Sequence, residues 1–307
     1  MAGEHADWDI DPDHQGVGHI TDRFHRAAML CRRDPLRLGN VVHLPDVGDA
    51  IVLGDLHGDL DNLQHVVTWA ALHKHSDRYL ILQELIHGGP DDGQGGDASF
   101  RLLEYAAALK CQFKSQVQVI LSNHDLAEMT GGVLTKAGKL VSELFRRGLA
   151  NAYGAAWPEV HQAYRQLLAS FPLAARTASG VFISHSTPGR DALRSFDYAI
   201  LDRPLTLDDC QRGSSLYEFV WGRAHDERAA NRFANAVGAQ ILVTGHQNSM
   251  PGVKAPTSRH IILTSDGPMG RFLQLPLATS VPHRALVRQV TKIRSLAPTK
   301  DKTRRQW

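Results

Sequence analysis

Five short apolar runs in this sequence each end in a side chain that can bind a metal ion or transfer a proton. The run IVLG is followed by Asp55 and His57, LILQ by Glu84, VILS by Asn123, His124 and Asp125, VFIS by His185, and LVTG by His246. Short apolar runs bounded by turn residues are typical of buried strands. In an open α/β sheet, ligands collect at the carboxyl ends of the strands, so these distant residues are expected to meet in one crevice.

The types of these side chains indicate a site for two transition-metal ions. Carboxylate, imidazole and amide donors together favour Mn, Fe or Zn over Ca or Mg, which prefer oxygen ligands. Two ions about 3.5–4 Å apart clamp a phosphate and lower the pKa of a bound water, which supplies hydroxide at neutral pH. Because two cations at that distance repel each other, an anionic side chain must lie between them. Asp55 and Glu84 are the candidates for this bridge.

Taken singly, each of these residues has an ordinary structural explanation. The chain contains 17 histidines, of which most must be structural or on the surface. Gly54 and Gly58, which flank Asp55 and His57, are also what a tight turn requires. The ordered set at five strand ends is the specific signal, and it predicts a dinuclear metal site.

The rest of the sequence predicts the elements that hold these residues in place. Helix-like and strand-like segments alternate, which is the pattern of an α/β fold with a sheet covered by helices. Residues 40–55 are predicted to form a β-hairpin around the turn Pro-Asp-Val-Gly. Helices are predicted at residues 20–33, 59–75 and 98–110, buried strands at 78–83, 117–122, 180–184 and 240–245, a helical insert at 126–170, and closing strands at 260–265 and 270–277. A helix followed by a solvated basic tail is predicted for residues 284–307.

Composition restricts the partners and the compartment. The formal net charge of the 307 residues is +2, so we expect no general attraction to nucleic acid or to an anionic membrane. The three cysteines are far apart and form no CxxC pair, which favours a reducing compartment. No apolar run approaches the roughly 20 residues of a membrane span, and residues 1–14 are acidic where a secretory signal is basic. A soluble cytoplasmic protein is expected.

Four of these motifs resemble the phosphoprotein phosphatase branch of the calcineurin-like metallophosphoesterases. They are GDLHG at residues 54–58, SNHD at 122–125, FPLAARTASGVFISHSTPG at 171–189 and VTGHQN at 243–248. The resemblance spans roughly residues 49–276, and it implies a central β-sandwich of mixed sheets flanked by helices. It divides the chain into a lead-in at 1–45, a metallophosphoesterase domain at 46–280 with its insert at 126–170, and a basic C-terminal helix and tail at 281–307.

The resemblance also implies roles for single residues. One ion would be held by Asp55, His57 and His246, with Asp55 bridging to a second ion held by Asn123 and His185.

The same resemblance implies which residues act on the substrate. His124 would be the general acid that protonates the leaving group, with Asp125 beside it in the motif. Trp221-Gly222-Arg223 is similar to a family segment whose arginine grips the phosphate, a task that suits a planar guanidinium. Asn123 would help Arg223 to position the phosphate. A surface ion pair is the ordinary alternative for Arg223.

The second signature of the family departs from its pattern. Glu84 replaces the usual bridging aspartate, His87 stands where an aspartate orients the catalytic histidine, and Gly88 stands where an arginine binds phosphate. His87 is therefore counted with the catalytic candidates. Asp91 or Asp92 could substitute for the missing groups, although a glycine-rich acidic loop is more often a plain turn.

Hydrolysis of a phosphomonoester, as in protein serine/threonine phosphatases, is the leading functional hypothesis. The substrate would be a phosphoprotein or a small phosphoester, with two Mn, Fe or Zn ions as cofactors. One alternative is a hydrolase of dinucleoside polyphosphates such as diadenosine tetraphosphate. A second, motivated by His87 and Gly88, is an inactive metal-binding scaffold, and a nuclease is a weaker third because aromatic and basic residues are not interleaved.

Overall fold

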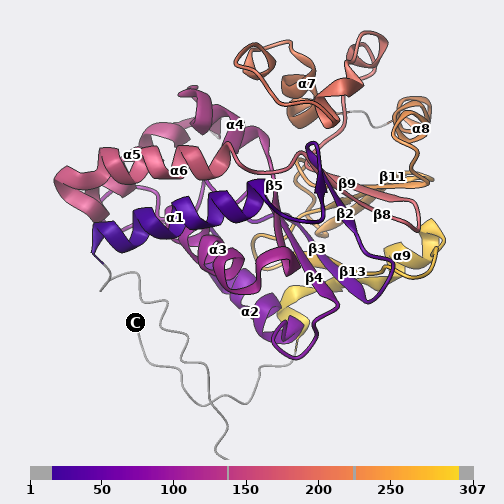
Figure 1. The fold of residues 1–307 in the computed structure, drawn as a ribbon, viewed down its shortest axis with the longest axis horizontal. Helices are drawn as coiled ribbons and strands as arrows, with labels where there is room; N and C mark the ends of the chain where they lie inside the picture. Colours follow the sequence, from indigo (N-terminus) through magenta and orange to yellow (C-terminus); the bar gives the residue numbers. More distant parts are fainter. Residues whose placement is uncertain (1–15, 137, 224–225, 297–307) are drawn as a thin grey trace, which may run out of the picture.

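Two β-sheets packed against each other form the centre of the computed structural model, which describes residues 16–136, 138–223 and 226–296 (Figure 1). The seven-stranded sheet has the order β1-β2-β8-β9-β10-β12-β11, with β1 Arg37–Leu38, β2 Val41–Leu44, β8 Ala174–Thr177, β9 Val181–Ser184, β10 Ile241–Thr244, β11 Val253–Thr257 and β12 His260–Leu263. The five-stranded sheet has the order β14-β13-β3-β4-β5, with β3 Asp49–Asp55, β4 Arg78–Gln83, β5 Val117–Ile120, β13 Arg271–Pro276 and β14 Val290–Lys292. Both sheets are mixed, which confirms the predicted sandwich.

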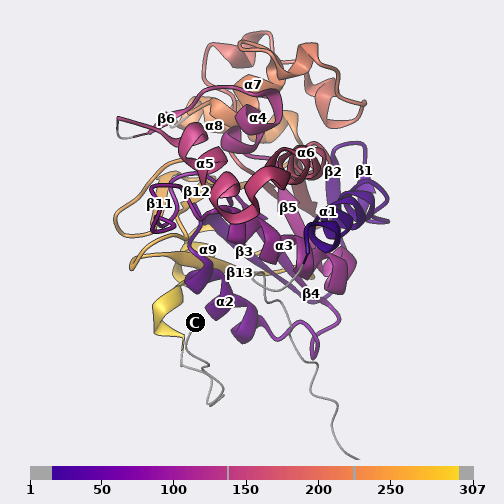
Figure 2. The same cartoon turned by 90° about the vertical axis from the view of Figure 1, so that its left-hand side faces the viewer.

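Helices cover the outside of this sandwich. They are α1 Val17–Arg32, α2 Leu60–Ala70, α3 Phe100–Phe113, α4 Asn123–Thr130, α5 Val141–Tyr153, α6 Trp157–Leu168, α7 Ser215–Trp221, α8 Glu227–Ala236 and α9 His283–Gln289. Figures 1 and 2 show α1, α5 and α6 gathered on one side of the sheets, with α7 at the top of both views. None of the helices in the described part of the chain is long and apolar enough to cross a membrane.

Strand β3 shows why these strands are apolar at nearly every position. Ala50 and Val52 belong to the core between the two sheets, whereas Ile51 and Leu53 belong to the core between the five-stranded sheet and its helices. Successive side chains of a strand point to opposite faces, and here both faces are covered. All four residues are therefore fully buried.

The β-hairpin predicted at residues 40–55 is wrong. Strand β2 lies in the seven-stranded sheet and pairs in parallel with β8, whereas β3 lies in the five-stranded sheet between β4 and β13. The turn between the two strands carries the chain from one layer of the sandwich to the other. Local turn chemistry indicates that the chain reverses, but it does not indicate which strand becomes the hydrogen-bonding partner.

The insert at residues 126–170 and the C-terminal segment contain β-strands that the sequence did not predict. The predicted insert contains α4, α5 and α6, together with a small hairpin made of β6 Thr135–Lys136 and β7 Lys139–Leu140. Near the C-terminus, α9 is followed by β14, which pairs with β13, where a solvated tail was expected. The basic residues from 297 to 307 lie outside the described residues.

A buried ion pair fixes α3 to the chain that follows α1. The Lys110 ammonium lies 2.7 Å from Asp34 Oδ2 and also donates to the Val117 carbonyl. Burial raises the pKa of Asp34, but the Lys110 charge and hydrogen bonds from Lys110 and Gln118 outweigh it, so the pKa falls below its ordinary value of 3.8. This pairing stabilises the fold above that pH, and its contribution is lost as the pH falls further.

We predict that Lys110→Met lowers the free energy of unfolding by about 3–5 kcal/mol at neutral pH, because Asp34 is left buried without its counter-charge. Lys114→Met is the matched control, since Lys114 is exposed just beyond the end of α3. Urea unfolding of both variants measures the difference. Equal stabilities would contradict a structural role for the pair.

Candidate metal centre

The six residues predicted as metal ligands come together where strands of both sheets end. Strands β3, β4 and β5 of the five-stranded sheet lead into Asp55, Glu84 and Asn123, and β9 and β10 of the seven-stranded sheet lead into His185 and His246. His57 lies two residues beyond the end of β3. An isolated bridge between residues 55 and 264 joins the two sheets at this point. The site is therefore built by both layers of the sandwich.

The donor atoms of these residues lie within a few ångströms of one another. His185 Nε2 is 2.6 Å from Asn123 Oδ1 and 3.0 Å from Glu84 Oε2. Asn123 Oδ1 is also 3.0 Å from His246 Nδ1. Ligand atoms that share one ion at about 2.0–2.2 Å are separated by roughly 3 Å, so this spacing suits a common metal ion.

Each of the three histidines has its second ring nitrogen next to a carbonyl oxygen. His57 Nδ1 is 2.9 Å from the His87 carbonyl, and His185 Nδ1 is 3.0 Å from Gln83 Oε1. His246 Nε2 is 3.2 Å from the Trp221 carbonyl. A carbonyl oxygen that accepts a proton from one nitrogen leaves the lone pair of the other free for a metal, which is the usual arrangement around metal-binding histidines. The residues therefore fit a metal centre.

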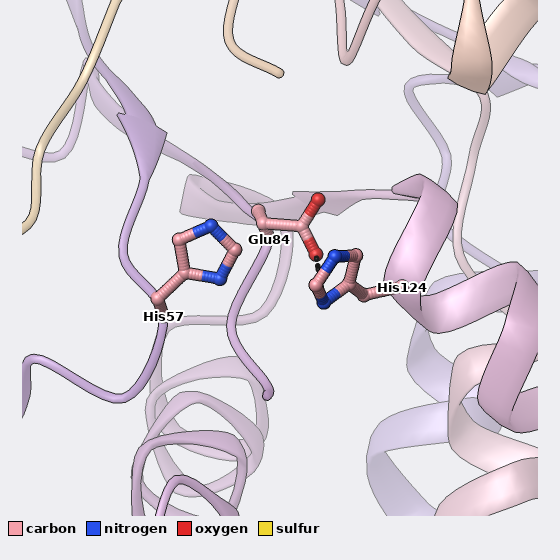
Figure 3. A group of neighbouring side chains, drawn as sticks. All are labelled: His57, Glu84 and His124. Atoms are coloured by element: carbon pink, nitrogen blue, oxygen red, sulfur yellow. Dashed lines mark ion pairs between the residues drawn. The ribbon is translucent and has the colours of Figure 1, made fainter. Parts of the chain in front are cut away.

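Glu84 is shared between two groups of donors. One group consists of His57, Glu84 and His124, and the other of Glu84, His185 and His246. Figure 3 shows the Glu84 carboxylate between the His57 and His124 rings, with its Oε1 3.7 Å from His124 Nδ1. The geometry thus places His246 with His185, where the resemblance had assigned it to the ion of His57. Glu84 belongs to both groups, as a carboxylate between two ions would.

Burial sets the protonation of these ligands. It raises the pKa of Asp55 to about 7, an effect that His185 opposes and the Glu84 charge strengthens. It raises the pKa of Glu84 to about 8 despite the nearby Lys136 charge. Burial also lowers the pKa of His57 to about 3 and that of His246 to about 2. Neutral imidazoles are ready to bind metal, and divalent cations would favour the two carboxylates as anions.

Backbone strain is concentrated at the same site. His57, Glu84, His87 and His246 have φ values of 43°, 49°, 68° and 65°, in the left-handed region that residues with side chains rarely adopt. Such conformations cost on the order of 1–3 kcal/mol each and persist only where the surrounding structure imposes them. The surrounding structure therefore holds these four residues in strained conformations, which set the directions of their side chains.

His124 lies in the first turn of α4 with 9% of its surface exposed. Its ring centroid is 5.2 Å from those of both His57 and His87, and burial together with neighbouring histidines lowers its pKa well below the ordinary value. Asp125 points the other way: its Oδ2 accepts a hydrogen bond from the Ser122 amide and closes a capping box at the start of α4. Its contacts are those of a helix cap.

His87 is buried and is held by a carboxylate that sequence reasoning missed. His87 Nε2 lies 3.0 Å from Glu128 Oε2, and Glu128 also bonds to Arg146 and His161. Burial favours the neutral form of Glu128, but hydrogen bonds from His161 and His87 and the charges of His87 and Arg146 hold its pKa below the usual range. The ring next to His124 is thus backed by a buried carboxylate.

The sequence contains a signal for each of the two residues that support these histidines, Gln83 and Glu128. Gln83 is a fully buried polar residue at the end of an apolar strand, and its amide donates to the Leu53 carbonyl, which turns Oε1 toward His185. Glu128 follows His124 by four residues, a spacing that places both on one face of a helix. A polar residue at the end of a buried strand, or on the helix face of a catalytic candidate, is the sequence signal for such a supporting role.

Asp91 and Asp92 accept hydrogen bonds from backbone amides of their own glycine-rich loop, as in an ordinary turn. The carboxylate that contacts Gly88 belongs to Asp97, whose Oδ2 accepts from the Gly88 amide at 2.7 Å.

Arg223 stands beside His246, with its Nε 3.2 Å from His246 Nε2. In the tautomer that leaves His246 Nδ1 free, Nε2 donates to the Trp221 carbonyl and Arg223 is available for another acceptor. No carboxylate in the described ranges forms an ion pair with Arg223, so the alternative of a surface ion pair finds no partner there.

A cavity of about 480 Å³ opens next to the ligands, and its lining includes His57 and Gly88. Three carboxylates, those of Asp59, Asp61 and Asp266, lie on its wall. A substrate that reaches the metal ligands from this side therefore passes an acidic surface.

A β-sandwich that gathers carboxylate, imidazole and amide donors at its strand ends defines a metal-dependent hydrolase. The sequence profile of the calcineurin-like phosphoesterases matches residues 50–250, about two thirds of the chain, and the chain belongs to this family. The enzyme is thus a metal-dependent phosphoesterase of the calcineurin-like family. No protein of curated function matches the sequence.

Solved structures share the fold at low sequence identity. A protein serine/threonine phosphatase from Saccharomyces cerevisiae with similarity to human phosphatase PP5 has a TM-score of 0.64 and 15% identity, over 85% of this chain and 82% of that one. The cold-active protein-tyrosine phosphatase of a psychrophilic Shewanella species has a TM-score of 0.55 and 12% identity, over 81% and 80% of the two chains.

We predict that Gly245→Ala weakens metal binding roughly 10- to 100-fold, the usual effect of disturbing a residue that supports a ligand. A Cβ at this position would lie 2.2 Å from Asp55 Oδ1, the atom that accepts a hydrogen bond from the His246 amide. Gly189→Ala is the control, because a Cβ there meets nothing within 4 Å. Metal titration of folded protein provides the comparison, and equal affinities would exclude Asp55 as a ligand.

We also predict that metal binding releases protons below about pH 8 and that metal affinity rises with pH up to the same value. The pKa values of Asp55 and Glu84, about 7 and about 8, mean that a proton must leave each carboxyl group when a cation binds. Calorimetry in buffers of different ionisation enthalpy measures this release, with Asp91→Asn as a control on an exposed loop. Metal binding without proton release at about pH 6 would contradict the prediction.

Proposed function

We propose that this enzyme is a phosphomonoesterase that acts on phosphorylated serine or threonine side chains of proteins or on small phosphoesters. Its ligand set is Asp55, His57, Glu84, Asn123, His185 and His246, with Glu84 as the bridging residue. The convergence of these donors at the strand ends, each histidine oriented by a carbonyl oxygen, carries the proposal. A pair of Mn, Fe or Zn ions at such a site supplies Lewis-acid charge and a hydroxide nucleophile at neutral pH.

The side chains around the ligands would handle the substrate. Arg223 and the Asn123 amide would hold the phosphoryl oxygens, since the guanidinium is next to His246 without a carboxylate partner among the described residues. His124 would take up a proton when the anionic phosphate binds beside it, and would give this proton to the leaving oxygen. His87, backed by Glu128, would position the His124 ring from 5.2 Å away. Asp125 would act through the helix cap that places His124.

The acidic cavity favours a monoester over a dinucleoside polyphosphate. A polyphosphate chain bound across Asp59, Asp61 and Asp266 would bring several negative charges next to three carboxylates, which raises its energy. A leaving group that is neutral or positively charged, such as a peptide segment with basic residues, meets no such penalty. Diadenosine polyphosphates are therefore the second choice of substrate.

The remaining assignments follow from the chain as a whole. We propose a metallophosphoesterase domain at residues 46–280, with the insert at 126–170 shaping its substrate groove. Cys31, Cys111 and Cys210 are all free thiols, which supports a reducing compartment such as the cytoplasm.

We predict that His124→Asn lowers kcat by roughly 10²- to 10⁴-fold, as expected for loss of a general acid, while metal content stays unchanged. The loss should be large for an alkyl phosphate and small for 4-nitrophenyl phosphate, because nitrophenolate leaves without protonation. His65→Asn on the exposed face of α2 is the control. An equal loss on both substrates would remove His124 from the role of acid.

A substrate panel under each metal tests the function itself. Phosphopeptides, diadenosine tetraphosphate and 4-nitrophenyl phosphate are compared with protein loaded with Mn, Fe, Zn or Mg. We expect Mn-, Fe- or Zn-dependent hydrolysis of the monoesters. Bound metal without turnover on any substrate would replace the proposal with that of a metal-binding scaffold.

A further inference from the structure

The space over Gly88 is occupied by a lysine from a distant part of the chain. A Cβ at residue 88 would lie 3.6 Å from Lys136 Nζ, 3.7 Å from its Cδ and 4.0 Å from its Cε. The end of the Lys136 side chain therefore runs along the volume that a side chain at position 88 would enter. Gly88 itself has a φ of 78°, which explains the glycine.

Lys136 reaches this position from the small hairpin between α4 and α5. It is the last residue of β6 and pairs with Lys139 of β7. The base of the hairpin is tied to the start of α5, where the Leu134 amide donates to Ser142 Oγ and the Val141 amide donates to the Leu134 carbonyl. The ammonium is thus brought to the metal centre by an anchored element.

Among the described residues, none is a partner that would explain the position of the ammonium. In the described ranges, no carboxylate lies in ion-pair distance of Lys136 and no hydrogen bond is formed by its Nζ. Its charge is nonetheless close enough to lower the pKa of Glu84 and Asp266 and of the His57 and His124 rings. A cation without a counter-ion beside a catalytic centre is suited to a mobile anion.

We propose that Lys136 binds the phosphoryl group of the substrate and supplies the cation that position 88 lacks in this chain. The inference rests on the proposed function and extends it to a substrate-binding residue. Arg223 stands beside His246 and Lys136 stands over Gly88, which lines the cavity together with His57. A phosphate dianion between them would be held from two sides, one by a planar guanidinium and one by a point charge.

The test measures the binding of inorganic phosphate to metal-loaded protein by calorimetry, and competitive inhibition by phosphate in parallel. Lys136→Met removes the charge and keeps the length of the side chain, whereas Lys136→Arg keeps the charge. Lys139→Met, which removes the same charge from the paired residue of the hairpin, is the matched control. Metal affinity and thermal unfolding are measured for every variant, so that a loss of ions or of folding is detected directly.

We expect Lys136→Met to weaken phosphate binding roughly 10- to 100-fold, the effect of one charge-assisted hydrogen bond, with metal affinity unchanged. Lys136→Arg should stay close to the parent protein, as should Lys139→Met. Unchanged phosphate binding in Lys136→Met would overturn the inference, and so would an equal loss in Lys139→Met, because that indicates a general field in place of a contact.

The two proposals fail in different ways. If the parent protein hydrolyses phosphomonoesters and Lys136→Met binds phosphate as well as the parent does, the function stands and the role of Lys136 is wrong. If no phosphoester is hydrolysed with any metal but Lys136→Met still loses phosphate affinity, the phosphate contact stands and the catalytic function is wrong.

Discussion

The structure depends on holding two carboxylates and several imidazoles together in a place where charge is unfavourable. Burial raises the pKa of Asp55 and Glu84 and lowers that of His57 and His246, so each group is pushed toward its neutral form. Divalent cations reverse this for the carboxylates, because they favour the anions. Such a cluster is stable in the folded chain only when its members are fixed by other contacts.

The two-layer architecture provides those contacts. Carbonyl oxygens of Gln83, His87 and Trp221 orient the three histidines, and the His246 amide holds the Asp55 carboxylate. These groups come from both sheets and from the loops between them, so no single supersecondary unit contains the site. Four of the site residues also adopt strained backbone conformations, which only a rigid surrounding structure maintains.

Two residues from elsewhere in the chain lie next to the altered second signature. His87 replaces an aspartate beside His124, and a carboxylate is present one contact further away, on Glu128. Gly88 provides no side chain, and the ammonium of Lys136 fills the space above it. Glu128 and Lys136 both come from the segment between β5 and β8, which also contains the helices α4, α5 and α6. A carboxylate and an ammonium from this segment thus lie beside His87 and Gly88.

Sequence by itself determined the class of fold and predicted a set of metal ligands. Apolar runs of a two-sided strand are recognisable without a structure, and a polar residue that ends such a run stands out, as Glu84, His185 and His246 do. Tertiary structure decided which donor atoms lie close together, which sheet receives β2, and that Glu128 and Lys136 reach the site. The reason is physical: local pattern reports the burial of a side chain, whereas its neighbours depend on how distant segments pack.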